Sequence, residues 1–456
     1  MQRVLAALAV LSMSAVATAQ AQSQPVKKSK AASFDAASLP SLETWTLGNG
    51  LQVAFLPMAK APSVTVQLWY HVGSKDEAPN RKGSAHMFEH MMFKGTDHVR
   101  AEEHARHLSR LGGYVNAFTT EDVTAYHNTL PADYLDFAIE LEAERMRNLW
   151  FREDMIQTEK QVVKEEIRQQ ENNPLYAGFL RFLEIAFQTH PYSWTAGGSL
   201  EDLDATSLED LKKFYGQYYV PNNALLVVVG QAQISEVKAS VVKWFGPLKK
   251  AAEPPRPAAE KVEPKQTKAR REVVAPAQIG VVMRGYHIPA AKHDDIKALQ
   301  VLALILSGGE SSRLYEQIVR KDKLAVQAGG QMVIREDPGL FMLFGAYLDA
   351  AGADKLEAAL SAQIERLRKS PVKAAELRKA KNQLLAEFVY GLESVTGIAN
   401  QIGYSWIQRG DPSLFLNDLA AFNKVTAADI KRVANLYLQD SQASVVVVPP
   451  GGAGAN

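Results

Sequence analysis

The sequence predicts an α+β protein made of two homologous α/β-roll domains, each an antiparallel sheet with packed helices. The main observation is an internal duplication, because SLEDLKKFYGQYYVPNNALLVVVG aligns with TAADIKRVANLYLQDSQASVVVVP without a gap. Both segments begin with a hydroxyl residue and an acid three residues later, Ser207 with Asp210 and Thr426 with Asp429. Each then continues as a basic amphipathic helix and ends in a hydrophobic strand. The chain has 456 residues, enough for two domains of about 200 residues.

Residues 1–21 are predicted to be a signal peptide. Arg3 precedes the apolar stretch VLAALAVLSMSAVA, which is short for a membrane span, and Ala17-Thr18-Ala19 forms a small-x-small cleavage site. Cleavage is expected after Ala19, with Ala21 as the alternative. No cysteine follows and no later apolar run reaches about 18 residues. The sequence therefore predicts a periplasmic or secreted protein with no membrane anchor.

The composition excludes several classes of protein. The net charge is +1, and basic residues alternate with acids, which argues against nucleic-acid binding. The chain contains no cysteine, so disulfides and thiolate metal ligands are also excluded.

Residues 40–248 are predicted to form the amino-terminal domain, which begins with strands. WTLGNGLQVAFLP contains the dipeptide Asn49-Gly50, which is typical of hairpin turns. The following segment, VTVQLWYHVGSKDE, alternates in the way expected of a half-buried strand.

The segment GSAHMFEHMMFKGT carries the main chemical signal. On a helix, His86 and His90 are neighbours at positions i and i+4, so both can reach one Zn²⁺ ion. Glu89 lies beside them and can take a proton from a bound water without being a ligand. The arrangement is the H-x-x-E-H inverzincin signature. Such a short motif can also arise by chance on an amphipathic helix, so the zinc hypothesis requires a third ligand on another element.

A second predicted helix, TEKQVVKEEIRQQENNP, can supply that ligand. Glu159 and Glu166 are seven residues apart, which is two helical turns, so both can face the same neighbouring element. The apolar stripe of this helix is expected to consist of Val162, Val163 and Ile167.

Together these residues resemble the pitrilysin family of zinc metallopeptidases, which includes insulin-degrading enzyme, and specifically the bacterial two-subunit type that is similar to the beta subunit of mitochondrial processing peptidase. In that family a glutamate some 76 residues after the second histidine is the third ligand, and another glutamate lies seven positions earlier. The resemblance therefore implies one Zn²⁺ per chain, held by His86, His90 and Glu166, with Glu159 orienting a ligand. Glu165 remains the weaker candidate, because it points about 100° away on the helix and is expected to be solvated.

The segment GGYVNAFTTEDVTAYHNTLP resembles the family's strand pair beside the zinc, where backbone near Asn116 and Ala117 holds an extended substrate. Backbone pairing suits a peptidase, because it accepts any sequence that can be stretched out. The alternative for Asn116 is a bulge or turn residue at the end of a strand.

The remaining segments complete the predicted organisation. Residues 249–273, rich in Pro, Lys and Glu, are expected to be an exposed linker, residues 274–449 the carboxy-terminal domain and residues 450–456 a flexible tail. Apolar spacing in this second half predicts four helices. They cover residues 294–306, 356–368, 374–390 and 394–409. His104 and His107 are also paired on a charged helix, but no third ligand accompanies them, and a surface position is expected.

The sequence thus predicts a secreted or periplasmic zinc metalloendopeptidase that hydrolyses peptides or unfolded protein segments. The competing hypothesis is a homologous scaffold or assembly subunit without turnover. Family members that are complete in one chain carry an arginine and, seven residues later, a tyrosine that help to stabilise the oxyanion. Alignment of SSRLYEQIVRKDKLAV places Val319 and Val326 at these positions, and Arg320 is expected to be a solvated charge. The resemblance therefore implies a homologous partner subunit that supplies both side chains.

Overall fold

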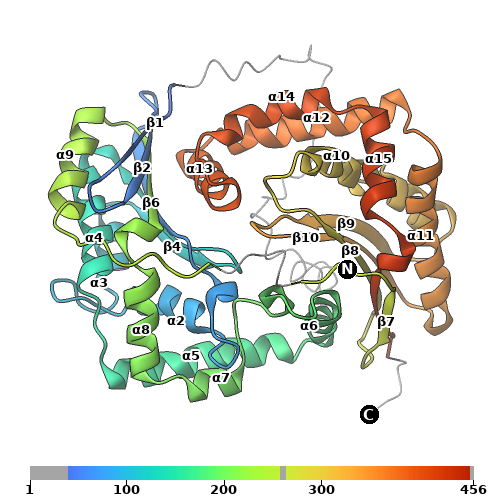
Figure 1. Cartoon of the computed structure of the whole chain (residues 1–456), viewed down its shortest axis with the longest axis horizontal. Coiled ribbons are helices and arrows are strands. Elements are labelled where there is room, and N and C mark those ends of the chain that lie inside the picture. The colour runs from blue at the N-terminus through green and yellow to red at the C-terminus, as the bar shows by residue number, and fades with distance from the viewer. Residues whose placement is uncertain (1–39, 257–262, 452–456) are drawn as a thin grey trace.

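The computed structural model describes residues 40–256 and 263–451, so the predicted signal peptide lies outside the described residues. The chain forms two halves, each a sheet with helices packed against it (Figure 1). This confirms the α+β fold class and the two antiparallel-sheet domains predicted from the sequence.

The first sheet has six strands in the order β1-β2-β6-β3-β5-β4. All neighbours are antiparallel except β2 and β6, which are parallel. The predicted Asn49-Gly50 turn joins β1 to β2, and Gly50 has the positive φ of 91° that such a turn needs. The strands of this sheet are β1 (Glu43–Thr46), β2 (Gln52–Pro57), β3 (Ser63–Tyr70), β4 (Tyr114–Thr119), β5 (Thr124–Pro131) and β6 (Ala224–Gly230).

The second sheet repeats this topology. Its order is β7-β11-β8-β10-β9, and only the pair β7 and β11 is parallel. Its order therefore matches that of the first sheet without β1. The strands are β7 (Arg270–Val273), β8 (Gly280–Ile288), β9 (Gln327–Val333), β10 (Gly339–Tyr347) and β11 (Ser444–Val448).

The duplicated segments form α8 followed by β6, and α15 followed by β11. Both helices begin with a capping box, in which Ser207 pairs with Asp210 and Thr426 with Asp429, as predicted. The helices of the first half are α2 (Ser84–Met91), α3 (Glu103–Arg110), α4 (Leu135–Arg147), α5 (Glu153–Glu171), α6 (Pro174–Ala186), α7 (Leu200–Ala205), α8 (Leu208–Tyr218) and α9 (Ile234–Phe245). Those of the second half are α10 (Asp295–Ser307), α11 (Ala353–Lys369), α12 (Ala374–Gly391), α13 (Val395–Arg409), α14 (Asp418–Lys424) and α15 (Ala427–Tyr437).

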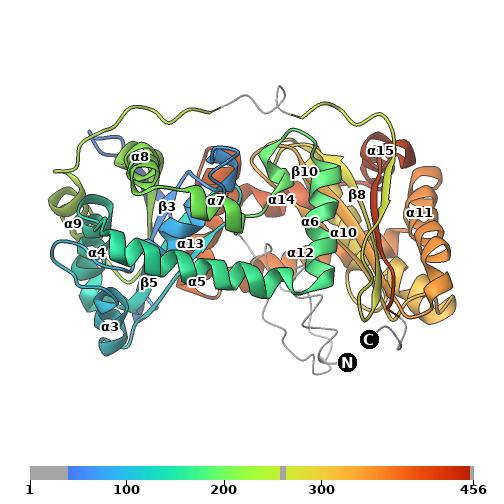
Figure 2. The ribbon, with the colours of Figure 1, turned by 90° about the horizontal axis from the view of Figure 1, so that it is seen from below.

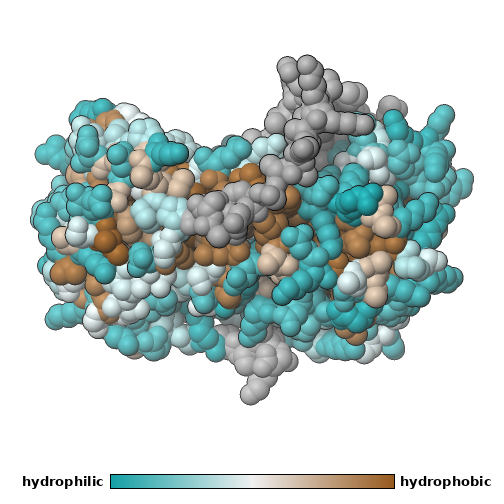
Figure 3. Space-filling view, turned by 90° about the horizontal axis from the view of Figure 1, so that it is seen from above, coloured by the Kyte–Doolittle hydropathy of each residue, from teal (hydrophilic) through white to brown (hydrophobic). Residues whose placement is uncertain are grey.

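The two halves each contribute a helix to the other's sheet. Helix α6 belongs to the first half of the chain but packs against β8 and β11 of the second sheet. Helix α13 belongs to the second half but packs against β3 and β6 of the first sheet. Both helices lie in the middle of the molecule (Figures 1 and 2). Seen from above, apolar residues gather along this middle region, as Figure 3 shows.

Two expectations from the sequence need correction. The predicted linker 249–273 ends too late, because Arg270–Val273 forms β7 and pairs with β11. On α5, Val162 is 43% exposed, whereas Val163 and Ile167 are buried with Ile156. Consecutive residues on a helix point about 100° apart, and on α5 this turn carries Val163 into the core and Val162 toward solvent.

Candidate zinc site

Helix α2 presents the H-x-x-E-H residues, and two sets of contacts hold it in place. Met87, Phe88 and Met91 are buried in the core of the first half. The Tyr126 hydroxyl donates to the carbonyl of Phe88 at 2.8 Å. Together these contacts leave His86, Glu89 and His90 on the opposite side of the helix.

The amino end of α2 is capped by a carboxylate from outside the helix. The Glu77 side chain accepts hydrogen bonds from the backbone N–H groups of Gly83 at 2.9 Å and Ala85 at 2.8 Å. Gly83 has a φ of 93°, which favours glycine at this position. Burial raises the pKa of Glu77 well above its ordinary value, and the two backbone hydrogen bonds oppose this shift.

The three predicted ligands converge. The Nε2 atoms of His86 and His90 are 3.3 Å apart, and Glu166 Oε2 lies 3.7 Å from the first and 3.6 Å from the second. A tetrahedral zinc ion with bonds of about 2.0–2.1 Å separates its ligand atoms by about 3.4 Å. The two imidazole nitrogens and one carboxylate oxygen therefore fit a zinc ion. Within residues 40–256 and 263–451, no other group of three His, Cys, Asp or Glu side chains comes together in this way.

Helix α5 brings Glu159 and Glu166 to the histidines, as their spacing predicted. Glu159 Oε1 lies 2.9 Å from His90 Nδ1, on the side of the ring away from Glu166. Glu165 points elsewhere: its side chain is 59% exposed and pairs with Arg168 at 3.3 Å. The solvated position expected for Glu165 is confirmed.

The charges of the site suit a metal ligand set. Burial and the nearby His90 lower the pKa of His86 to about 4, so this imidazole is neutral near pH 7. Burial also disfavours a charged His90, but Glu159 and Glu166 outweigh burial and raise its pKa. Burial acts to raise the pKa of Glu159, and its hydrogen bonds to His90 and Lys94 reverse this effect and lower it. A divalent cation displaces the proton from such histidines when it binds.

Glu89 lies in the groove beside these ligands. Burial raises its pKa, while Thr119 and His90 act in the opposite direction. A carboxylate with a raised pKa is better matched to accepting a proton near neutral pH. The groove has a volume of about 310 Å³. It is lined by Glu89, His90, Phe93, Lys94, Glu102, Ala105, Val115, Asn116, Ala117 and Glu159.

Asn116 and Ala117 form one wall of the groove. Both lie within β4, in regular register opposite His127 and Tyr126 of β5, so Asn116 is not a bulge or a turn residue. Strand β4 is the last strand of the first sheet. Backbone groups on its outer side are therefore available to pair with an extended peptide.

The expectation of a surface position for His104 is wrong. His104 is buried, and its Nε2 lies 3.3 Å from Asn128 Oδ1. Its ring also packs edge-on against Phe93. The apolar phase of α3 places His104 and Leu108 toward the core, so His104 and His107 have different environments in spite of their spacing.

Sequence reasoning missed Lys94 and Glu102, which line the groove. The ammonium of Lys94 lies 3.1 Å from Glu159 Oε2 and 2.7 Å from Glu102 Oε1. Lys94 follows His90 by four residues, and this spacing was the one signal in the sequence. Glu102 comes from the loop before α3, and nothing in the sequence connects it to the motif.

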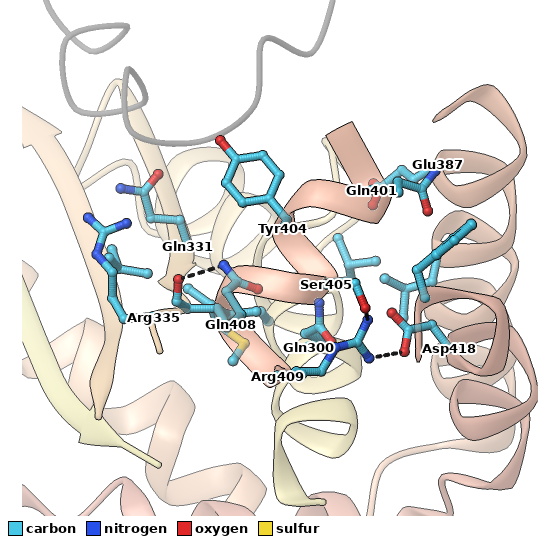
Figure 4. Close-up of a pocket in the computed structure, with 18 of the residues that line it drawn as sticks. Gln300, Gln331, Arg335, Glu387, Gln401, Tyr404, Ser405, Gln408, Arg409 and Asp418 are labelled. Carbon is cyan, nitrogen blue, oxygen red and sulfur yellow. Dashed lines mark hydrogen bonds and ion pairs between the residues drawn. The ribbon is translucent and has the colours of Figure 1, made fainter. Parts of the chain in front are cut away.

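A further cavity, of about 520 Å³, lies in the second half between β9, α10, α12 and α13 (Figure 4). Three of its polar side chains bond to one another, because Arg409 pairs with Asp418 at 2.6 Å and with Ser405 at 3.0 Å. Gln408 donates to the carbonyl of Ile334 at 3.3 Å. No histidine lines this cavity, so the groove at Glu89 and His90 is the better candidate for catalysis.

Comparisons with known proteins identify the family of this chain. Residues 52–197 match the family model described as insulinase, peptidase family M16, and residues 205–384 match the model described as the peptidase M16 inactive domain. The chain is 36% identical to the zinc protease PqqE of Helicobacter pylori over 90% of this chain and 94% of that protein.

Two solved structures show the same fold. The crystal structure of a protease from Helicobacter pylori has a TM-score of 0.86 and 36% identity, covering 90% of this chain and 100% of that one. The periplasmic protease PqqL of Escherichia coli has a TM-score of 0.75 and 19% identity, covering 90% of this chain but 48% of that one. The family models and the Helicobacter pylori relative confirm the resemblance to the pitrilysin family. The chain belongs to the M16 family of zinc peptidases, the pitrilysin-type peptidases.

Proposed function

We propose that this chain is the zinc-bearing subunit of a metalloendopeptidase that hydrolyses peptides or unfolded protein segments. The observation that carries the proposal is the convergence of His86, His90 and Glu166 on one point, with Glu89 beside them in a groove. A zinc ion held there would polarise a peptide carbonyl and activate a water molecule.

The chain's own residues account for the other steps. Glu89 accepts the proton of the attacking water and passes it to the leaving amine. The outer edge of β4, near Asn116 and Ala117, holds the substrate in an extended form through backbone hydrogen bonds. Glu159 holds the His90 ring by accepting the hydrogen of Nδ1, which leaves Nε2 free for the metal.

Exchange of Glu89 for glutamine tests this mechanism. The Glu89→Gln variant should keep its zinc, because Glu89 is not a ligand, and should lose peptide hydrolysis by about 10²–10⁴-fold, because an amide cannot take the proton. Zinc content by atomic emission and cleavage of a fluorogenic peptide are the two measurements. Normal turnover in a zinc-loaded variant would remove Glu89 from the role of base.

The alternative is a homologous scaffold subunit that binds no substrate productively. The match of residues 205–384 to a model described as an inactive domain is the observation in its favour. The complete set of ligands and base in the first half favours the enzyme. A scaffold would show no hydrolysis in the wild-type chain, whatever its zinc content.

We also propose a homologous partner subunit. Val319, in the π-helical turn Tyr315–Lys321, packs partly against the second core, and Val326 is 49% exposed. Neither valine side chain can donate a hydrogen bond to an oxyanion. Arg320 is exposed and pairs with Glu316 at 2.7 Å, so it does not replace the missing arginine. The larger size of PqqL, of which this chain matches 48%, is consistent with a catalytic unit that contains two such folds.

The partner hypothesis predicts weak activity of the isolated chain, because the loss of an oxyanion donor costs about 10²–10³-fold in rate. Light scattering and peptide cleavage should be measured with the chain alone and after addition of a homologous chain that carries the arginine and tyrosine. Full activity of the unpartnered chain would contradict the hypothesis and favour a self-sufficient enzyme.

We further propose that the protein acts in the periplasm or outside the cell. The support is the predicted cleavable segment at residues 1–21, which lies outside the described residues. Among the described helices, none combines the length and the apolar character that a membrane crossing requires. Determination of the amino-terminal sequence of the exported protein would test the predicted cleavage after Ala19.

A further inference from the structure

Lys94 connects two parts of the groove that are distant in sequence. It lies just after α2, and its backbone N–H donates to the carbonyl of Met91 at 2.9 Å. Its side chain is 26% exposed, and its ammonium bonds to Glu159 at 3.1 Å and Glu102 at 2.7 Å. A single cation therefore joins a carboxylate of α5 to a carboxylate of the loop before α3.

The backbone at Glu102 is unusual. Its φ is 64°, in the left-handed region, and among the described non-glycine residues only Lys323 shares this feature. The N–H of Glu102 donates to the carbonyl of Phe93 at 2.9 Å, and Phe93 immediately precedes Lys94. Backbone in this region persists where surrounding contacts hold it. Here the contacts bring the Glu102 carboxylate to Lys94.

Glu159 has two polar partners, one on each oxygen. Oε1 accepts from His90 Nδ1 at 2.9 Å, and Oε2 accepts from Lys94. The Glu159 side chain is only 5% exposed, so water cannot replace a lost partner easily. The position of Glu159, and through it the orientation of the His90 ring, therefore depends on Lys94.

We propose that Lys94 is a positioning residue of the zinc site, which holds Glu159 against His90 and is itself held by Glu102. This inference rests on the proposed zinc site. When the group that hydrogen-bonds the second nitrogen of a ligand histidine is mutated, metal affinity typically falls by about 10–100-fold.

The sign of the effect separates this role from simple charge repulsion. Lys94 carries a positive charge close to a site for a divalent cation, so its removal would strengthen zinc binding if its charge were all that mattered. A positioning role predicts the opposite, namely weaker binding.

The experiment measures the dissociation constant of zinc by competition with a fluorescent chelator, using the full mature chain. Lys94→Met should raise this constant about tenfold. Lys94→Arg should restore most of the affinity, since a guanidinium can still bond two carboxylates. Glu102→Gln should give a smaller loss than Lys94→Met. Lys297→Met is the matched control, because Lys297 pairs with Asp418 at 2.8 Å in the second half, away from α2 and α5.

Two further measurements exclude a general structural effect. The melting temperature of the metal-free protein should fall no more for Lys94→Met than for Lys297→Met. In a Glu159→Gln background, Lys94→Met should cause no additional loss of zinc affinity, because Lys94 acts through Glu159.

Zinc binding by Lys94→Met that is equal to or tighter than wild type overturns the inference and leaves the proposed function intact. If Lys94→Met lowers zinc affinity equally in the wild-type and the Glu159→Gln backgrounds, the inference is also overturned. If the wild-type chain binds no zinc, both the inference and the proposed function fail.

Discussion

Glu159 and Glu166 face opposite sides of the same imidazole. Glu159 meets Nδ1 of His90, while Glu166 lies near Nε2 of both His90 and His86. Because Glu159 accepts the hydrogen of Nδ1, the lone pair of His90 is on Nε2, where a metal can use it. Two residues of the same type, two turns apart on one helix, thus have different proposed roles.

A comparison of Glu166→Gln with Glu165→Gln tests the assignment of the third ligand. Glu166→Gln should weaken zinc binding by about a hundredfold or more, because removal of a ligand costs at least as much as removal of its supporting partner. Glu165→Gln should bind zinc as the wild type does, since Glu165 is exposed and pairs with Arg168. Zinc content is measured after dialysis against a mild chelator. Equal zinc in the two variants would show that Glu166 is not the third ligand.

Helix α13 packs closely against the sheet of the other half. Gly403 faces the indole of Trp69, which is fully buried, and a Cβ atom at Gly403 would overlap the ring. Trp69 is also fixed by a hydrogen bond from its Nε1 to Gln67 Oε1 at 2.9 Å. The glycine therefore sets how near α13 can come to β3.

Gly403→Ala should destabilise the protein by about 1–3 kcal/mol, since overpacking forces the indole or the helix to move. Gly216→Ala on α8 is the matched control, because no atom beyond the local helix backbone lies within 4 Å of the added Cβ there. That change should be neutral or stabilising by up to about 1 kcal/mol, as alanine favours helix more than glycine does. Urea denaturation gives both values. Equal stability of the two variants would mean that α13 is not tightly held against the first sheet.

At the scale of the whole molecule, a cluster of largely buried charges joins the two halves. Lys75 of the first half lies 2.9 Å from Asp122 and also pairs with Glu336 of the second half. The backbone N–H of Glu336 donates to Asp122 at 3.0 Å. Asp122 and its neighbour Glu121 follow β4, so the cluster also fixes the end of the strand that lines the groove. The other polar members are His71, Glu121, His190, Tyr192, Arg335 and Asp337.

Acid should weaken the contact between the halves. Burial opposes ionisation of Asp122, but Lys75 and Arg335 outweigh burial and lower its pKa. Burial also opposes ionisation of Glu336, but His71 and Lys75 lower its pKa to about 2. A carboxylate with a lowered pKa stabilises the folded form above its unfolded pKa of about 4, and loses this contribution as the pH falls through its folded pKa. The contact should therefore loosen progressively below about pH 4.5.

Energy transfer between dyes on the two halves can measure this change. The chain has no cysteine, so one can be introduced at exposed Val242 on α9 and one at exposed Leu436 on α15. Circular dichroism recorded in parallel reports the folding of the chain as a whole. In the first half, buried Glu77 has a raised pKa, which opposes acid unfolding. Lys75→Met should move the loosening to higher pH. A constant dye distance down to pH 2.5 would contradict the prediction.

The sequence by itself was sufficient for features that depend on local spacing. His86, Glu89 and His90 share one helix, so their juxtaposition follows from the period of 3.6 residues. The same period distinguished Glu166 from Glu165. The hydroxyl and acid residues at Ser207 and Thr426 predicted two equivalent helix starts, and with them the duplicated sheets.

Only the tertiary structure decided which distant segments meet. The exchange of α6 and α13 between the sheets could not be predicted, because an apolar helix face shows that it is buried but not against what. For the same reason the sequence predicts a linker where β7 forms, since a short strand with alternate exposed residues gives little signal before its partner is known. Two sets of contacts join residues from separate elements: those of Lys94 with Glu159 and Glu102, and that of Lys75 with Glu336. No spacing along the chain predicts these contacts.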